Sequence, residues 1–266
     1  MRKYLFVSQM GLQMSLAYRL NYLISVLAAG FPLLLQVMFW HAIFTYTQAE
    51  QVYGYRYEEM MAYALFAALV SQALRTGFEY EVATDIKEGG LNRFLTQPLS
   101  YSVYRLAAFV GQNLGYFTAT LLLIGGCAVL LNHWLQMAVS LSDYFRMLGV
   151  LCGAFFIQFF LFYLIGLAAF WMQEVWGVFE SIRIVGLVLS GGVFPLTVFG
   201  EAGMAVLRYL PFQYVVFFPI EVVLGRVTGS DLMIGVAIQG AWIIGLFSLS
   251  RLVWNRGCKH FIALGG

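Results

Sequence analysis

Charged side chains are scarce in this sequence of 266 residues. Asp, Glu, Lys and Arg together make up 11% of it, whereas 61% of the residues are hydrophobic and the mean hydropathy is +0.80. A soluble domain carries about 25% charged residues. A water-exposed globule of this length would lack polar surface, so the composition is typical of an integral membrane protein. The net charge of +2 is too small to indicate a nucleic-acid partner.

Signatures of catalysis and metal binding are missing as well. The sequence holds no phosphate-binding G-x-x-x-x-G-K-[ST] loop, no H-E-x-x-H pair and no G-x-S-x-G elbow. Its histidines and cysteines are scattered and show no metal or disulfide spacing: His41, His133, His260, Cys127, Cys152 and Cys258. We therefore predict no catalytic residue, no metal and no cofactor on this chain.

Acidic groups are sparse within the apolar runs. A secondary transporter usually needs ionisable groups near the membrane midplane for ion coupling. Glu79, Glu81, Glu174 and Glu180 instead lie near the inner ends of the runs. This placement argues against an ion gradient acting through the chain, and the energy source is expected elsewhere.

What remains is a series of long apolar segments of helical length. A transmembrane helix needs about 20 residues, and the second and fifth segments are short enough to need their flanks. The second is expected to continue as helix to about Asp85. The first begins too late and is too long for a cleaved signal peptide, so we expect it to be retained. The six predicted spans of this all-α protein are Asn21–Tyr46, Met60–Leu74, Val103–Leu131, Met147–Trp171, Ile184–Phe199 and Leu232–Ser250.

Basic residues orient these spans. With both termini in the cytoplasm, the inner segments hold eleven arginines and lysines and the outer segments hold four, as the positive-inside rule requires. The inner set is Arg2, Lys3, Arg19, Arg75, Lys87, Arg93, Arg105, Arg183, Arg251, Arg256 and Lys259, and the outer set is Arg56, Arg146, Arg208 and Arg226. We predict one multi-pass domain over residues 1–266 in the inner (plasma) membrane, with both termini cytoplasmic.

Two stretches are expected to lie along the membrane or partly within it. Residues 1–20 are amphipathic at helical spacing, which favours a helix in the inner interface; alternatively, they lengthen the first span. Residues 200–226 are mostly apolar but are interrupted by Pro211, Pro219 and charged residues. Because proline bends or ends helices, this region is expected to form short re-entrant helices on the outer face.

The segment "TDIKEGGLNRFLTQPLSY", residues 84–101, is the longest polar interruption in the first half of the chain. Its glycine pair indicates a sharp turn and its proline a stop, around a short helix with one apolar face. We expect that face in the membrane surface and a charged face in the cytosol; the alternative is a solvated loop. The apolar set is Ile86, Gly90, Leu91, Phe94 and Leu95, and the polar set is Lys87, Glu88, Asn92, Arg93 and Gln97.

The stretch "IKEGGLNRFLTQPLS" resembles the cytoplasmic coupling-helix region of type-2 ABC transporter permeases, a class that exports drugs, lipids and polysaccharides. That family places an acidic-Gly-x-Leu-x-x-x-Leu-x-x-Pro stretch between its second and third spans. The matching residues are Glu88, Gly89, Gly90, Leu91, Phe94, Leu95 and Pro98. Later, "SGGVFPL" (190–196) and "LPFQYVVFFPIEVVLG" (210–225) look like the family's fifth span and its outer re-entrant helices.

The resemblance implies a permease subunit of an ATP-driven exporter that moves an amphipathic or apolar substrate out of the cytoplasm or inner leaflet. ATP and Mg would bind a separate cytoplasmic ATP-binding subunit, which would dock on a coupling helix at residues 85–98. The permease would pair in the lipid bilayer with a second permease, either a copy of itself or a sister chain. The implied docking residues are Lys87, Glu88, Gly89, Gly90, Leu91, Asn92, Arg93 and Phe94.

Several other residues have paired interpretations. Three near the fifth span could form an inner gate or touch the ATPase, or could simply reach the inner interface. Three near the outer mouth could pair or gate, or could sit at the water interface. The sequence Gly111-x-x-x-Gly115 is typical of a helix contact, within the protomer or in a dimer. The candidate gate residues are Glu174, Glu180, Arg183, Arg208, Pro211 and Glu221.

The main rival to an ATP-driven permease is an ATP-independent membrane protein, either a secondary carrier or a scaffold subunit. A co-purifying ATPase would separate the two hypotheses.

Overall fold

The chain folds as a helical bundle. The structure is a computed structural model and describes residues 2–17, 19–96, 99–135 and 140–261. Apart from an isolated bridge between Val52 and Tyr55, the regular structure in these ranges is helical. The longer helices are α1 (Arg2–Ala17), α2 (Arg19–Thr47), α3 (Tyr57–Ala73), α6 (Tyr101–Leu135), α7 (Leu141–Leu167), α8 (Trp176–Leu189) and α11 (Gly229–His260).

Short helices connect the long ones at both ends of the bundle. The α-helical ones are α4 (Phe78–Lys87), α5 (Asn92–Leu95), α9 (Gly200–Leu207) and α10 (Phe217–Val223). The 3-10 turns are η1 (Ala168–Phe170), η2 (Leu196–Phe199) and η3 (Phe212–Tyr214).

Among the described residues, three stretches are long and apolar enough to cross a membrane: Tyr101–Cys127, Leu141–Phe170 and Gly229–His260. They coincide with the third, fourth and sixth predicted spans. Length and apolar character of this kind, in a chain whose described part is almost wholly helical, are those of an all-α membrane protein.

Two predicted spans have the wrong bounds. The second does not continue to Asp85 as one helix, because α3 ends at Ala73 and α4 begins only at Phe78. The fifth was expected over Ile184–Phe199, but α8 ends at Leu189. There the chain turns through Gly191, whose φ of +85° lies in the left-handed region that favours glycine. Apolar residues continue beyond the break after α8, so hydropathy alone did not locate that end, whereas the break after α3 holds the polar residues Arg75 and Thr76.

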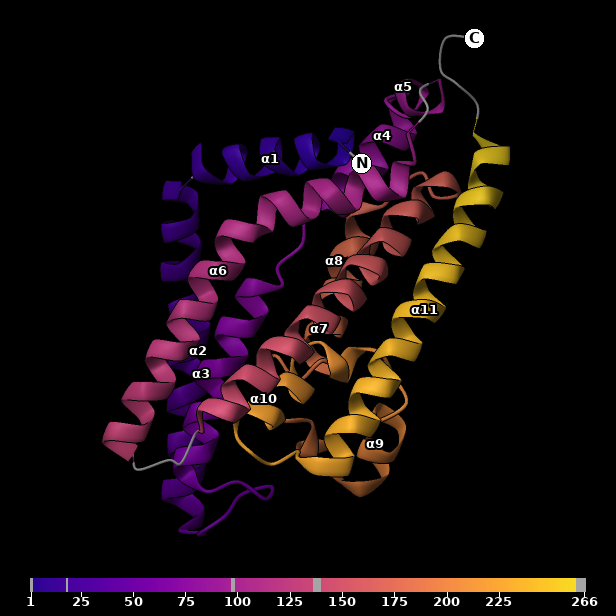
Figure 1. Cartoon of the computed structure of the whole chain (residues 1–266). Coiled ribbons are helices and arrows are strands. Elements are labelled where there is room, and N and C mark those ends of the chain that lie inside the picture. The colour runs from indigo at the N-terminus through magenta and orange to yellow at the C-terminus, as the bar shows by residue number, and fades with distance from the viewer. Residues whose placement is uncertain (1, 18, 97–98, 136–139, 262–266) are drawn as a thin grey trace.

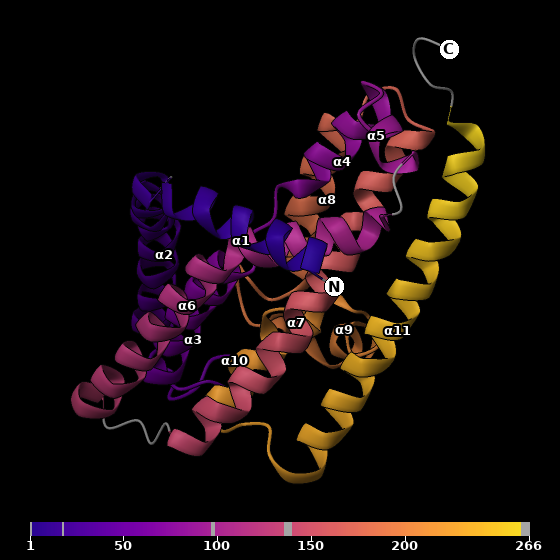
Figure 2. The same ribbon diagram turned by 45° about the horizontal axis from the view of Figure 1, so that its top comes forward.

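The elements fall at two ends of the bundle. Figure 1 shows α1, α4, α5, the N-terminus and the far end of α11 at one end. The α2–α3 connection, α9, α10 and the start of α11 lie at the other end. Helix α1 runs across its end of the bundle instead of along it, and Figure 2 keeps it beside α6. The two ends are called below the α4 end and the α10 end.

Helices α1 and α6 cross with their backbones in contact. A Cβ atom on Gly11 would lie 2.9 Å from the backbone nitrogen of Gln112, and one on Gly111 would overlap the carbonyl of Ser8. The hydroxyl of Tyr4 also accepts a hydrogen bond from the backbone N–H of Ser100 at 3.0 Å. Gly111 therefore makes its close contact within this chain, one of the two alternatives that its spacing left open.

Candidate functional site

The polar interruption after the second apolar segment folds as two short helices joined by a turn. Helix α4 ends at Lys87, the turn covers residues 88–91, and α5 begins at Asn92. The predicted sharp turn is present, because Gly89 has φ +76°. At Gly90 a Cβ atom would lie 2.7 Å from Asp85 Oδ1, so the turn closes against α4. The single amphipathic helix expected over this segment is therefore wrong, since the turn divides it.

The apolar side chains of this α4–α5 element point into the protein. Ile86 and Phe94 are 6% exposed and Leu91 is fully buried. Phe94 packs its ring against Tyr101 and Tyr104 of α6, with ring centroids 4.9 and 4.7 Å apart. The expectation that this face lies in the membrane surface is wrong, because its side chains belong to the core. The side chain of Leu95 lies outside the described residues.

The polar side chains of the element differ in how much they are exposed. Glu88 and Arg93 are exposed, and Lys87 and Asn92 are half-buried. The Lys87 ammonium donates a hydrogen bond to the carbonyl of Gln173, and Arg93 Nη2 lies 3.3 Å from Asp85 Oδ1. Among the described residues, Glu88 makes no ion pair and no side-chain hydrogen bond. Its carboxylate is therefore available to a partner.

Beneath this surface, Asp85 and Arg105 tie α4 to α6. Both side chains are buried, and the Arg105 guanidinium donates hydrogen bonds to the carboxylates of Asp85 and Glu81. Tyr101 completes the cluster, since its hydroxyl donates to Asp85 Oδ2 at 2.8 Å and accepts from Arg105 Nε at 2.9 Å. Buried charges need such pairing, because an isolated one is strongly penalised. Glu81, Asp85 and Tyr101 were not among the predicted site residues.

A second set of contacts ties α4 to α8. Glu79, which is fully buried, lies 2.5 Å from Arg183, measured from Oε1 to Nη2. Arg183 also lies 3.8 Å from Glu180, and the Tyr80 hydroxyl donates to Glu180 at 2.5 Å. The ring of Tyr80 stacks on Trp176 with centroids 4.5 Å apart. Two of the predicted inner-gate residues thus contact each other and α4.

The electrostatics of this cluster follow from burial. Helix α4 carries four charged side chains in ten residues and lies outside the candidate spans. Burial raises the pKa of the Glu79 carboxyl above its ordinary value, and the nearby Arg183 guanidinium opposes that rise. Burial and the hydrogen bond to Glu180 raise the pKa of Tyr80 to about 12. Glu174, the remaining inner candidate, is exposed and forms no ion pair with the described residues.

The outer candidates are divided between two places. Glu221 is buried at the α10 end, where it accepts a hydrogen bond from the Tyr55 hydroxyl at 2.7 Å and lies 3.3 Å from Arg226 Nε. Arg208 is exposed and has no ion pair with the described residues, so Arg226 is the partner of Glu221. Pro211 is buried and lies directly before η3.

Arg226 links three segments at the α10 end. Arg226 Nη1 donates to the carbonyl of Gly54 at 3.0 Å and lies 3.3 Å from Glu59 Oε2. Its guanidinium also lies 4.1 Å from the centroid of the Tyr55 ring. Arg226 therefore joins the α2–α3 connection, α3 and the end of α10. From the sequence it was predicted only as one of the outer charges.

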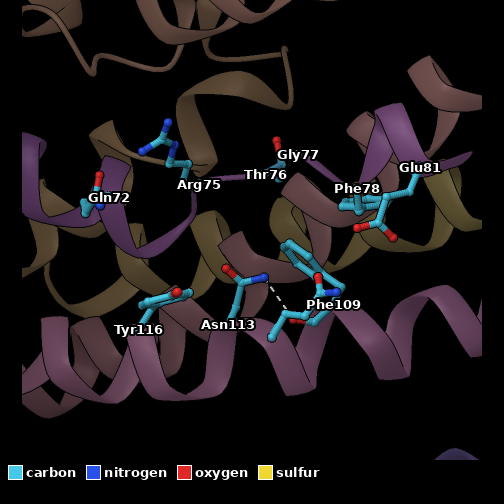
Figure 3. A pocket seen from close by; sticks show the side chains of 10 residues that line it. Gln72, Arg75, Thr76, Gly77, Phe78, Glu81, Phe109, Asn113 and Tyr116 are labelled. Carbon is cyan, nitrogen blue, oxygen red and sulfur yellow. Dashed lines mark hydrogen bonds between the residues drawn. The ribbon is translucent and has the colours of Figure 1, made fainter. Parts of the chain in front are cut away.

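A cavity of about 360 Å³ lies beside the break between α3 and α4 (Figure 3). Phe78 and Phe109 supply apolar lining, and Asn113 of α6 donates to the Phe109 carbonyl at 2.9 Å. The Arg75 guanidinium points away from α6 in this view. Within the described part of the chain, no group of three His, Cys, Asp or Glu side chains is placed to hold a metal ion. Gln72, Arg75, Thr76 and Glu81 also line this cavity, so it offers polar contacts to a ligand or partner.

Comparison with known proteins places the chain by sequence. The model of the family described as "ABC-2 family transporter protein" matches residues 31–265, which is most of the chain. No curated protein and no solved structure matches it significantly.

Proposed function

Because the chain belongs to the ABC-2 transporter family and is a transmembrane subunit, we propose that it is the permease of an ATP-driven exporter whose ATPase is a separate cytoplasmic chain. The ATPase docks on the α4–α5 element, with Glu88 and Arg93 as the exposed charges and Lys87 and Asn92 beside them. ATP and Mg are held by that partner, and this chain carries no cofactor. The cargo is an amphipathic or apolar molecule that moves outward.

The observation that carries this proposal is the double attachment of α4. Exposed charges at residues 88 and 93 sit on an element whose buried face is fixed to α6 through Asp85 and to α8 through Glu79. Movement of a partner bound to the exposed surface is therefore transmitted to α6 and α8 through ion pairs and hydrogen bonds. This is the mechanical requirement for coupling a partner's motion to transmembrane helices.

The arrangement of the ends supports the proposed topology of six spans with cytoplasmic termini. Helix α1, the far end of α11 and the α4–α5 element lie at the same end of the bundle in Figure 1. With that end in the cytoplasm, α1 lies along the inner interface as an amphipathic helix. The α9–α10 region then forms the outer re-entrant part, where Arg226 and Glu221 close the mouth. The permease pairs with a second permease to complete the exporter.

The test is a pull-down of the full chain from its native membrane in mild detergent, with the partners identified by mass. We expect a stoichiometric ATP-binding subunit with the wild-type chain and its loss from Glu88→Lys. Glu88 is the informative position, because the structure gives its carboxylate no internal partner within the described residues and its reversal disturbs no fold contact. Glu50→Lys is the matched control, since it makes the same change at an exposed residue in the α2–α3 connection, at the opposite end.

Two results would contradict the proposal. An unchanged ATPase yield from Glu88→Lys would exclude docking at this surface. A chain that comes down alone, under conditions that keep other ABC complexes intact, would favour an ion-coupled carrier or a scaffold. The same pull-down reports whether the second permease is a copy or a different chain.

A further inference from the structure

A second cavity, larger than that of Figure 3, lies within the bundle between α2, α3, α7 and α8. Its volume is about 760 Å³, which falls within the range of about 300–1,000 Å³ typical of small-molecule sites. Its walls are mostly apolar, with Leu35 of α2, Phe162 and Ile165 of α7, and Leu187 of α8 among them. A ligand there meets a long hydrocarbon-like surface, as the apolar part of an amphiphile requires.

The cavity has a polar end at the break between α3 and α4. Gln72, Arg75 and Thr76 line both this cavity and the smaller one of Figure 3, so the two cavities share this part of their walls. Arg75 is exposed, and it forms no ion pair with any residue in the described ranges. A cation without a counter-charge beside an apolar cavity attracts an anionic group.

Two buried polar atoms on the cavity lining also lack a partner. Ser71 Oγ and Arg183 Nε are both shielded from solvent, and neither has a hydrogen-bond partner among the described residues. Each of them carries a hydrogen to donate, and a buried donor left unsatisfied costs about 1–3 kcal/mol. Ser71 stands about one helical turn before Arg75 at the end of α3. Each of the two atoms would be satisfied by a hydrogen-bond acceptor bound beside it in the cavity.

The sign of the charge at this end is set by Arg75. Of the described residues that line the cavity, two are arginines and none is acidic. Arg183 shares its charge with Glu79 and Glu180, whereas Arg75 shares its charge with no described carboxylate. The uncompensated charge at the polar end is therefore positive.

We propose that this cavity binds a single-chain amphiphile with an anionic head, with the head at Arg75 and Ser71 and the chain along the wall of α7. This deepens the proposed function and rests on it, because it names the class of cargo for the same permease. The head is a phosphate, sulfate or carboxylate, which Arg binds through paired hydrogen bonds. We expect the ligand to have one hydrocarbon chain, because the volume of the cavity is that of a drug-sized ligand.

The experiment uses the purified full chain in nanodiscs of phosphatidylcholine and a dodecyl phosphate that carries a diazirine in its chain. After photolysis, labelled peptides are mapped by mass. We expect labelling on α3, α7 and α8, displaced by unlabelled dodecyl phosphate at an about tenfold lower concentration than by dodecyl maltoside or dodecyltrimethylammonium. Arg75→Gln should abolish this preference for the anion. Arg251→Gln should keep it, because it removes the same charge from α11, which does not line the cavity.

A second variant tests the apolar part. Gly186 lines the cavity, and a Cβ atom there meets only the Phe212 ring at an ordinary distance of 3.9 Å. Gly186→Leu should therefore fold and should lower labelling at the three helices, because its side chain occupies the space. Three results would overturn the proposal. They are equal displacement by the three competitors, an equal loss of the preference for the anion in Arg251→Gln, and labelling spread over all lipid-facing helices.

The source of the ligand and the proposed function are tested separately. In nanodiscs that contain phosphatidylglycerol we expect labelling to persist, whereas displacement would overturn the single-chain part and assign the site to a bilayer lipid. The binding assay needs no ATPase. A failed pull-down with intact anion binding therefore overturns the exporter, and an intact pull-down without anion preference overturns only this inference.

Discussion

The carboxylate of Glu79 lies 2.5 Å from the guanidinium of Arg183, and this contact joins α4 to α8 across 104 residues of sequence. Glu79 is fully buried, whereas the Arg183 side chain is 31% exposed. The pair is therefore asymmetric. Arg183 retains part of its hydration without its partner, but Glu79 depends on Arg183 for its only counter-charge within the described residues.

Removal of Arg183 should destabilise the chain. Breaking one side of a buried ion pair costs about 3–5 kcal/mol, but the exposed part of Arg183 is screened, so for Arg183→Gln we expect about 1–3 kcal/mol. The measurement is the unfolding midpoint in detergent, with Arg251→Gln as the control for loss of an exposed arginine. An Arg183→Gln midpoint equal to that of the control would contradict the role given to the pair.

Glu79 should also make stability depend on pH. Burial raises its pKa, so from about pH 4.3 upward the folded chain keeps a proton that the unfolded chain has lost. Its contribution is greatest below the ordinary carboxyl pKa and falls as the pH rises through the raised value. Glu79→Gln should remove this fall, so its unfolding midpoint should decline less over that range than the wild-type midpoint. Parallel pH curves for the two proteins would show that Glu79 does not titrate in this way.

Gly90 should not tolerate a side chain. A Cβ atom there lies 2.7 Å from Asp85 Oδ1, so Gly90→Ala must displace the carboxylate that Arg105 holds. Overpacking of this kind costs about 1–3 kcal/mol, and we expect a lower unfolding midpoint. Gly77→Ala is the matched control, because nothing lies within 4 Å of a Cβ atom there. Equal effects of the two variants would count against the tight closure of the turn.

The crossing of α1 and α6 should be equally sensitive. A Cβ atom on Gly111 overlaps the carbonyl of Ser8, which is backbone and moves only if α1 moves. Gly111→Ala should therefore separate the two helices at a cost of about 1–3 kcal/mol and expose α1 to limited proteolysis. On the same helix, Gly126→Ala has nothing within 4 Å and should behave as wild type. Unchanged protection of α1 in Gly111→Ala would refute the contact.

At the α10 end, the hydroxyl of Tyr55 should contribute to stability through Glu221. Tyr55→Phe removes a 2.7 Å hydrogen bond to a buried carboxylate, for which we expect a loss of about 1.5–3 kcal/mol in unfolding free energy. The exposed Tyr53 provides the control, since Tyr53→Phe removes a hydroxyl that lies outside this cluster. An equal loss of unfolding free energy in Tyr55→Phe and Tyr53→Phe would show that the hydrogen bond to Glu221 is not its cause.

The sequence predicted the helical class, because that class depends on local composition; docking at the candidate site stays a prediction. Scarcity of charge indicated a membrane protein, and the break between apolar runs at residues 84–101 marked the α4–α5 element. The turn at Gly89 was also predictable, since paired glycines signal it. The bounds of the fifth span were less predictable, although Gly191 and Pro195 already marked the break where α8 ends.

The contacts that hold the element were not predictable in the same way. Asp85 meets Arg105 across 20 residues and Glu79 meets Arg183 across 104, so each pairing depends on how helices pack. The direction of Leu91 and Phe94 was misjudged for the same reason. An amphipathic pattern shows that one face is apolar, but it does not say whether lipid or protein covers that face.

Attachment and transmission in the α4–α5 element rest on different side chains. Glu88 faces outward without an internal contact in the described structure, whereas Asp85 and Glu79 are buried beneath it. On the proposed function, damage to the buried pairs leaves the outer surface free to hold its ATPase while the link to α6 or α8 is broken. Such a complex would assemble normally and consume ATP in a futile cycle, a defect that an assembly assay alone would miss.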